Sequence, residues 1–380
     1  MATGSQVGTV CGLYLRESTK SRPAFVAGGF VREFATRLLR ACGTEPLRLE
    51  AGIWVLPFST PVFGAVADAV LRESGAVTLA LHTTVSEVRT EGPRVVEVRS
   101  LAWNESLGVR PRVVVDCTGE ATVAGLAGAG IETGASDQAP ALVFSLADVE
   151  SAQTECGLLE VRRELRRAVA SGVLPAVCER LALIPGTNRD GRMDLKLNLA
   201  PADSERPLWK QVTSWERDTR ALVLELHRFL VQNTATCRRA RLTSVAPQLG
   251  VRSGRRIQGR AELADEDVLL ARKSPLGVAR GCWPMERWIK VGRPEMSYFD
   301  EGDYYEVALD CLRTAKPDNL FAAGRCFGAG AGAMSSARVV GTALATGWAA
   351  GTAAAFQAAG RPLDEAVETV RRQANEGAAP

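Results

Sequence analysis

Three arginines that lie close together in the sequence could bind an anion. Arg252, Arg255 and Arg256 fall within five residues, and their apolar neighbours indicate a partly buried segment. Guanidinium groups in such a segment suit a carboxylate or another anionic oxygen group. Two interpretations are open. The arginines bind a substrate, or they form structural ion pairs with acids further along the chain, namely Glu262, Asp265 and Asp267.

Two strand-to-helix turns built from small residues could hold a second anionic group. The first turn, Thr118-Gly119-Glu120, follows the apolar strand predicted at 112–116, and the second begins at Gly324-Arg325 after the apolar segment 318–323. Glycine between a buried strand and a helix lets backbone amides approach a ligand, and the helix N-terminus there favours negative charge. The turns therefore predict a nucleotide cofactor, and a helix predicted at 335–359 would direct its N-terminus towards it.

A third glycine-rich stretch fits a dinucleotide fingerprint only in part. Gly328, Gly330 and Ala333 have the spacing of that motif. The motif also needs a following strand with an acidic residue that holds a ribose, and here a polar segment follows instead. This argues against an NAD-dependent dehydrogenase that uses this turn.

Four stretches resemble FAD-dependent oxidoreductases that have a glutathione-reductase-type Rossmann domain. Residues 112–121 are similar to the ATGD turn of these proteins, and residues 7–14 to the loop after their ribose strand. Residues 250–259 resemble their arginine-rich interior segment, and residues 324–353 resemble their C-terminal flavin segment. The blocks span almost the whole chain in the expected order.

The resemblance implies an α/β fold, with an FAD/NAD(P)-binding Rossmann-like domain and an inserted α+β substrate domain. The expected division is 1–138 for the first part of the FAD-binding domain, 139–317 for the substrate or cap domain, 318–360 for the closing strand and helix, and 361–380 for a polar tail. The opening βαβ unit with its GxGxxG turn, which normally grips the adenosine ribose, is missing before Met1. Either the recorded sequence starts at an internal Met, or the gene is a degenerate remnant.

The function that the resemblance implies is hydride transfer between flavin and a small-molecule substrate that the sequence does not identify. The alternative is a truncated flavoprotein without cofactor or activity. The cofactor-binding residues implied are Gly8, Thr9, Gly12, Thr118, Gly119, Glu120, Gly324, Arg325, Arg338, Val339 and Thr342. The candidates for catalysis are Tyr14, which would handle a proton, together with Cys11 and Arg255, and the candidates for substrate binding are Arg252 and Arg256.

Composition narrows the class of protein. The chain has 380 residues, of which 46% are hydrophobic and 23% charged, and its net charge is +3. The sequence has no basic run interleaved with aromatics, so it shows no nucleic-acid footprint. It also lacks a signal-peptide pattern and a strongly apolar stretch of membrane-spanning length. We expect a cytoplasmic protein without a membrane partner, and an uncovered sheet edge would favour a homo-oligomer.

The cysteines and histidines of the sequence do not form a recognisable metal-binding motif. The chain has nine cysteines without CxxC spacing, so an iron-sulfur cluster is unsupported, although some distant relatives of the family carry one. His82 and His227 are the only histidines, and both fit surface or core roles. We therefore predict no metal.

Hydrophobic periodicity predicts the remaining elements. The expected helices are 25–42, 60–74, 122–128 and 208–231, and the expected strands are 77–81, 85–89, 95–102, 139–148, 193–199 and 241–246. The segment after Gly360 is expected to be an exposed helix that frays.

Overall fold

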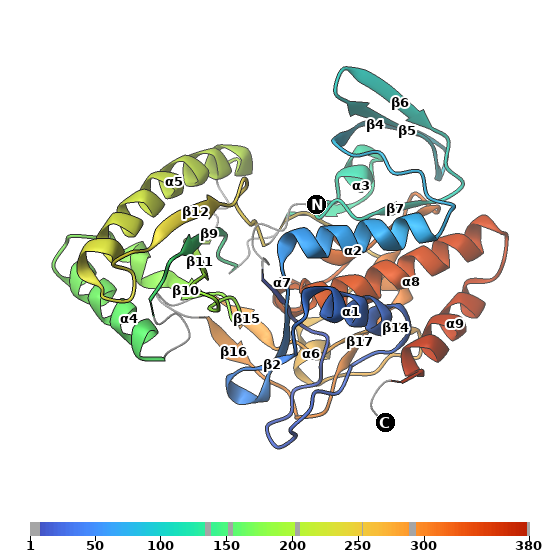
Figure 1. The fold of residues 1–380 in the computed structure, drawn as a ribbon. Helices are drawn as coiled ribbons and strands as arrows, with labels where there is room; N and C mark the ends of the chain where they lie inside the picture. The colour runs from blue at the N-terminus through green and yellow to red at the C-terminus, as the bar shows by residue number, and fades with distance from the viewer. Residues whose placement is uncertain are drawn as a thin grey trace.

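The structure is a computed structural model that describes residues 8–133, 138–150, 155–201, 206–252, 254–288 and 294–377. Two bodies lie side by side in Figure 1. The main body combines both ends of the chain, and the second body comes from its middle. A narrow ribbon projects from the main body and consists of β4 (Thr83–Glu91), β5 (Arg94–Ala102) and β6 (Glu105–Val109).

The main body contains several small sheets packed with helices. Its strands are β1 (Thr9–Val10), β2 (Leu47–Arg48), β3 (Trp54–Pro57), β7 (Val114–Asp116), β8 (Ile131–Glu132), β13 (Arg256–Ile257), β14 (Gly277–Gly281), β15 (Met285–Arg287), β16 (Glu295–Ser297), β17 (Tyr305–Ala308) and β18 (Leu320–Ala322). Its helices are α1 (Gly29–Cys42), α2 (Thr60–Glu73), α3 (Thr122–Leu126), α6 (Asp265–Leu269), α7 (Ala331–Ala337), α8 (Val340–Ala358) and α9 (Leu363–Asn375). The pair β7 and β18 is parallel, and β1 pairs antiparallel with β3.

The second body is a four-stranded antiparallel sheet with two long helices. The strand order is β10 (Leu181–Leu183), β11 (Met193–Asn198), β9 (Ala141–Ala147), β12 (Arg241–Val245), and the helices are α4 (Glu155–Ala170) and α5 (Leu208–Asn233). Strand alternation explains this packing, because every second side chain of a strand points to the same face. Leu195 and Leu197 of β11 and Phe144 of β9 are buried with apolar residues of α4 and α5.

Each of the two bodies has its own hydrophobic core. The core of the second body is drawn from residues between Leu142 and Leu249. Buried side chains between Leu263 and Leu312 belong to the core of the main body. The domain limits expected from the sequence stay a prediction, and by packing the second body comprises about residues 141–251.

The helix expected at 335–359 is two helices. The axes of α7 and α8 differ by 96°. In an unbroken helix the Gly341 N–H would donate to the carbonyl four residues earlier. It donates instead to the Cys11 carbonyl at 2.9 Å, so the chain turns at Arg338 and Val339. Within the described residues no single helix is long and apolar enough to cross a membrane, although α7 and α8 together meet that test by length and composition.

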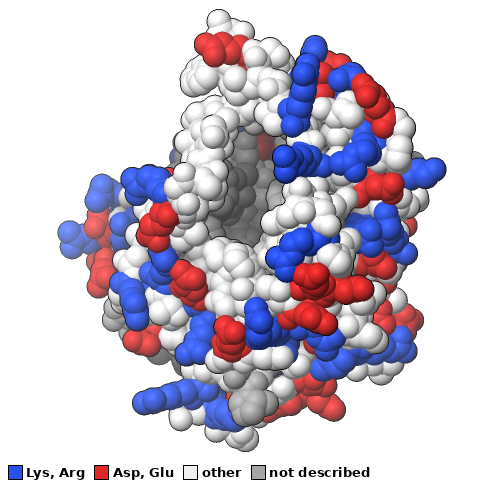
Figure 2. All heavy atoms as spheres, turned by 90° about the vertical axis from the view of Figure 1, so that its right-hand side faces the viewer, with Lys and Arg blue, Asp and Glu red and all other residues white. Residues whose placement is uncertain are grey.

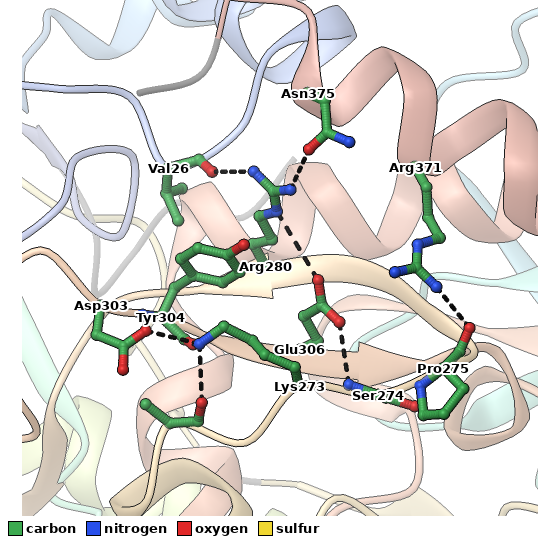
Figure 3. A network of polar contacts seen from close by, with 11 residues as sticks. Val26, Lys273, Ser274, Pro275, Arg280, Asp303, Tyr304, Glu306, Arg371 and Asn375 are labelled. Carbon is green, nitrogen blue, oxygen red and sulfur yellow. Dashed lines mark hydrogen bonds and ion pairs between the residues drawn. The ribbon is translucent and has the colours of Figure 1, made fainter. Parts of the chain in front are cut away.

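The expected exposed tail is a packed helix. Val367 and Val370 of α9 are buried in the main core. Figure 3 shows how polar contacts attach this helix to β14 and its neighbours. The Arg280 guanidinium donates to the Val26 carbonyl at 3.3 Å and to the Asn375 side chain, and Arg371 donates to the Pro275 carbonyl at 2.6 Å. The expectation was wrong because the buried face of α9 is narrow and its other residues are charged.

The strand expected at 77–81 is irregular chain. The side chains of Val77, Leu79 and Leu81 are half exposed or more, and strand β4 starts only at Thr83. Trp103, at the turn between β5 and β6, is 85% exposed. Figure 2 shows a hollow below the projecting ribbon, with a rim made mainly of uncharged atoms.

Asn319 connects the ribbon to the parallel strand pair. Its buried side chain accepts from the Val95 N–H at 2.8 Å and donates to the carbonyls of Val95 and Arg112 at 2.9 and 3.1 Å. These bonds satisfy backbone groups that lie between β5 and β7.

Replacing Asn319 by Ala would leave the Val95 N–H and carbonyl unpaired in the interior. Each unpaired buried group costs about 1–3 kcal/mol. We expect N319A to lower the free energy of unfolding by about 2–5 kcal/mol in thermal or urea denaturation. The control is N233A, which removes one exposed bond to the Phe229 carbonyl, and equal destabilisation of both variants would contradict the expectation.

Candidate functional site

The turn after β7 is held by one buried carboxylate. Asp116 is fully buried, and its Oδ1 accepts from the Thr118 N–H at 2.9 Å and the Thr118 hydroxyl at 2.7 Å. Its Oδ2 accepts from the Ala124 N–H at 3.0 Å, in the first turn of α3. Asp116 therefore fixes the path of the chain from β7 through the glycine turn into α3.

Two turns far apart in the sequence meet at this point. Gly119 has a φ of 78°, and its N–H donates to the Cys326 Sγ at 2.9 Å. A Cβ on Gly119 would lie 2.6 Å from Arg325 Nη2, so only glycine allows the guanidinium to lie there. Arg325 Nη2 is 3.6 Å from Glu120 Oε1, and burial raises the pKa of Glu120. The structure thus brings together the predicted cofactor residues 118–120 and 324–325.

The loop after β1 lies against the start of α8. Gly12 has a φ of 76°, and a Cβ there would come within 2.5 Å of the Val339 side chain and 3.5 Å of Thr342 Oγ1. Gly341 is required for a similar reason, since its Cβ would meet the Gly12 carbonyl oxygen at 2.3 Å. Gly12, Val339 and Thr342, all predicted from the resemblance, therefore form one contact.

The other two predicted residues of this loop face elsewhere. Gly8 approaches the second body, where a Cβ would meet Ile184 at 2.6 Å. Thr9 pairs with Pro57 in the ladder of β1 and β3.

The two candidate catalytic residues of this loop carry no charge at neutral pH. Tyr14 is 3% exposed, its ring is 4.8 Å from that of Phe25, and burial raises its pKa far above the ordinary value. Burial likewise raises the pKa of Cys11 to about 11, so the neutral thiol is favoured over the thiolate. The catalytic roles of both residues stay a prediction.

The glycines at 330 and 332 accommodate a carboxylate of the protein itself. The Ala333 N–H, in the first turn of α7, donates to Asp265 Oδ1 at 2.7 Å. A Cβ on Gly332 would lie 2.3 Å from Asp265 Oδ2, and one on Gly330 would lie 2.8 Å from Oδ1. This N-terminus is already occupied by an acid, which argues further against a nucleotide phosphate there.

The three clustered arginines have three different environments. Arg255 is exposed, and only its backbone N–H bonds to Glu120 Oε2, at 3.4 Å. Arg256 is buried and structural, because its Nε donates to the Ala329 carbonyl at 2.8 Å and its Nη2 lies 3.4 Å from Glu132 Oε2. Arg252 is 3% exposed, and its Nη1 has no hydrogen-bond partner in the described structure.

Arg252 belongs to a cluster of charged side chains between the two bodies. We name Lys196, Arg252, Glu286 and Arg338 the buried charge cluster. Arg252 and Arg338 are buried, and Lys196 and Glu286 are partly exposed. Arg338 Nη2 donates to Glu286 Oε2 at 3.0 Å and to Gln138 Oε1 at 2.7 Å. Burial raises the pKa of Glu286, but Arg338, Arg252 and Lys196 outweigh that effect and hold it below the ordinary value.

Two residues of the cluster and one beside it were not predicted from the sequence. They resemble no motif: Lys196 of β11, Glu286 of β15 and Trp288, which directly follows β15. The signal for Lys196 was the alternation Asp194, Lys196, Asn198 in β11, which puts polar side chains on one face of an otherwise apolar strand.

A cavity of about 690 Å³ lies between the two bodies. The main body contributes residues 57–61 to its wall. The second body contributes Val143, Ser145, Asp194 and two further segments, 186–192 and 244–248, of which not every residue lines it. No group of three or more His, Cys, Asp or Glu side chains among the described residues could hold a metal ion.

Removing the Asp116 carboxylate tests its role in the turn. Hydrogen bonds to a charged group contribute about 1.5–3 kcal/mol each, so D116A should lower the free energy of unfolding by about 3 kcal/mol or more. The control is D218A in α5, which removes an exposed ion pair with Arg217 and should cost less than about 1 kcal/mol. If denaturation shows equal effects, the turn does not depend on Asp116.

Comparisons with known proteins identify the family. A model of the family described as FAD dependent oxidoreductase matches residues 1–373. A search of curated proteins finds no match.

Solved structures that match this chain include two flavin-dependent halogenases and a hydroxylase. A triple mutant of a flavin-dependent brominase is 15% identical over 98% of this chain and 69% of that chain, with a TM-score of 0.39. A myxobacterial chondrochloren halogenase is 14% identical over 97% and 64%, with a TM-score of 0.40. The anhydrotetracycline hydroxylase from Streptomyces rimosus is 14% identical over 96% and 60%, with a TM-score of 0.37. The chain therefore spans less than two thirds of the last two proteins.

The family match covers nearly the whole chain. It confirms the predicted resemblance and the predicted α/β class with a Rossmann-like FAD domain. The chain belongs to the FAD-dependent oxidoreductase family.

Proposed function

We propose that this protein transfers a hydride between a small-molecule substrate and FAD. The flavin would be bound where Gly12 meets Val339 and Thr342, beside Arg338. The observation that carries this placement is a buried donor without a hydrogen-bond partner in the described structure, Arg338 Nε. The Thr342 hydroxyl, four residues further on, interacts with the buried Tyr305 side chain.

The unpaired Arg338 donor fits the polar edge of a flavin ring. Thr342 is fully buried and Arg338 is 6% exposed. A buried donor without a partner costs about 1–3 kcal/mol, a cost that a ligand carbonyl or ring nitrogen would remove. Gly12 lets the loop after β1 approach Val339 and Thr342 more closely than any larger residue would allow. The chain therefore offers a buried donor and a neighbouring hydroxyl to a planar polar group.

The protein's own contribution would be position and charge. When bound, the flavin supplies the redox chemistry. Arg338 would favour negative charge on the group that it contacts, and the Glu286 and Gln138 oxygens hold its guanidinium in place. The packing of the loop after β1 against α8 would exclude water from that contact.

The two turns at 118–120 and 324–325 would support the cofactor site and would not bind a phosphate directly. Arg325 lies over Gly119 and contacts Glu120, so this turn already contains a cation that could face an anionic group. Substrate would enter the cavity between the two bodies and approach from the side of Arg252.

FAD binding tests this proposal directly. We expect purified protein to show flavin absorbance, or to gain it when FAD is added. Replacing Thr342 by Val should weaken FAD binding roughly fivefold to tenfold, which corresponds to about 1 kcal/mol for one hydrogen bond. The variant's thermal midpoint should change little, because the Tyr305 hydroxyl near Thr342 keeps its bond to the Ser336 hydroxyl, at 2.9 Å.

The matched control is T369V in α9, whose hydroxyl bonds to the Glu365 carbonyl at 2.8 Å. Its FAD affinity should equal that of the wild type. A colourless protein that does not bind added FAD, or equal affinities of T342V and wild type, would contradict the placement.

A further inference from the structure

We infer that the substrate carries a carboxylate, which Lys196 and Arg252 bind at one end of the cavity between the two bodies. The identification of this ligand as the substrate rests on the proposed function. The binding site for a carboxylate follows from charges, contacts and position in the fold.

The buried charge cluster contains more positive than negative groups. Arg338 is paired with Glu286, at 3.0 Å. Arg252 has only neutral neighbours in contact, since its Nη2 donates to Asn198 Oδ1 at 2.8 Å and its guanidinium lies 5.2 Å from the centre of the Trp288 ring. Lys196 has neither a hydrogen bond nor an ion pair in the part of the chain that the structure describes. Lys196 and Arg252 thus have no ion-pair contact of their own among the described residues, and three cations share the single charge of Glu286.

An unpaired charge in a protein interior is strongly unfavourable unless a partner or ligand compensates it. Burial lowers the pKa of Lys196 to about 8, and the neighbouring Arg252 lowers it further. Burial also lowers the pKa of Arg252 to about 10, against the opposing effect of Glu286. These shifts describe a site that lacks negative charge, which a bound anion would supply.

Neither cation lines the cavity itself, but strand geometry places Lys196 next to it. Side chains of β11 alternate, so Lys196 points to the same face as Asp194, which lines the cavity. Lys196 is also paired across the ladder with Val143, another lining residue. Asn198 follows on the same face and binds Arg252. The cations therefore lie where this face of the sheet continues past the cavity wall.

The cavity wall favours a ligand with an apolar part. Phe58, Val143 and Val245 supply apolar surface. The charged residues of the wall are two acids and two arginines, so the wall adds no net charge to that of Lys196 and Arg252. A carboxylate on a small apolar body therefore fits the wall better than phosphate or sulfate, which have no apolar part.

The test is calorimetric titration of the purified full chain with benzoate, its neutral analogue benzamide, and sulfate. The variants are K196M and R252M, each of which keeps length and removes charge, and R252K, which keeps the charge. The matched control is K210M, a lysine exposed on α5 of the same body.

We expect saturable binding of benzoate, weaker binding of sulfate, and no detectable binding of benzamide. K196M and R252M should each weaken benzoate binding roughly tenfold to a hundredfold, as for the loss of one charge-assisted hydrogen bond, and R252K should weaken it less. K210M should bind as the wild type does. Absence of benzoate binding, equal binding of benzamide, or unchanged affinity in both K196M and R252M would overturn the inference. Sulfate binding tighter than benzoate would overturn the choice of a carboxylate.

The thermal midpoint distinguishes a binding role of Lys196 from a purely structural role. Removing an unpaired buried cation should raise the thermal midpoint in the absence of benzoate, so K196M should melt at or above the wild-type temperature. A large fall in the midpoint would show that Lys196 is paired in the folded protein and would overturn the inference.

The pH dependence isolates Lys196. The titratable groups near it are Cys11 from the loop after β1, Arg252 from the segment after β12, Glu286 of β15 and Arg338 between α7 and α8. The pKa values of Cys11 and Arg252 are about 11 and 10, and that of Glu286 is held below its ordinary value, so only Lys196 changes charge between pH 7 and 9. Benzoate affinity should be constant near pH 7 and fall as the pH rises through about 8, and K196M should lose this dependence.

Stability depends on pH in the opposite direction to benzoate affinity. The folded-state pKa of Lys196 lies below the ordinary 10.5, so the unfolded chain binds more protons between about pH 8 and 10.5. The contribution of Lys196 to the free energy of unfolding therefore rises with pH across that window. The wild type should gain stability relative to K196M over the same range.

All of these measurements record heat or melting, not turnover. They can be made with or without FAD bound. If FAD does not bind but benzoate does, the proposed function fails and the carboxylate site stands. If FAD binds and benzoate does not, the reverse conclusion holds.

Discussion

The burial of the Arg338 guanidinium is the constraint on which the arrangement of the site depends. Its side chain extends from the corner between α7 and α8 to Glu286 of β15 and to Gln138, which precedes the first strand of the second body. A buried cation needs such partners. Satisfying it fixes the corner of the two helices, the position of β15, and the point where the chain leaves the main body. The proposed flavin contact at Thr342 lies four residues after Arg338, and the cations Lys196 and Arg252 lie close enough to Arg338 to feel its charge.

Much of the fold could be predicted because local pattern decides it. The helices at 208–231 and 60–74 and the strands at 193–199 and 241–246 were predicted within a few residues, since amphipathic periodicity and packing agree there. The corner at Arg338 could not be predicted. It depends on a hydrogen bond between Gly341 and Cys11, residues more than three hundred positions apart. The sequence around it has the small residues of an unbroken helix.

The candidate site was predictable only in part, for a related reason. A glycine in the sequence indicates that another group comes close to the backbone, but it does not identify that group. The Asp265 carboxylate lies against Gly332, the Arg325 guanidinium against Gly119, and a backbone carbonyl against Gly341. Clustered arginines likewise indicate that partners are needed, but the sequence does not show which arginine already has partners within the protein. Arg256 is satisfied within the protein, whereas one donor of Arg252 is not. That distinction comes from tertiary contacts.

Two cations without ion-pair contacts of their own reduce the stability of the folded chain, and a fold selected for stability alone would replace them with apolar residues. They lie where the sheet of the second body faces the main body, and this is also where the cavity opens. A ligand that binds there would contact both bodies at once and restore the charge balance between them. The same interaction that recognises an anion would then strengthen the association of the two bodies, because binding to the folded state alone adds its free energy to the stability of that state. Substrate recognition and closure of the site would be one event in such an arrangement.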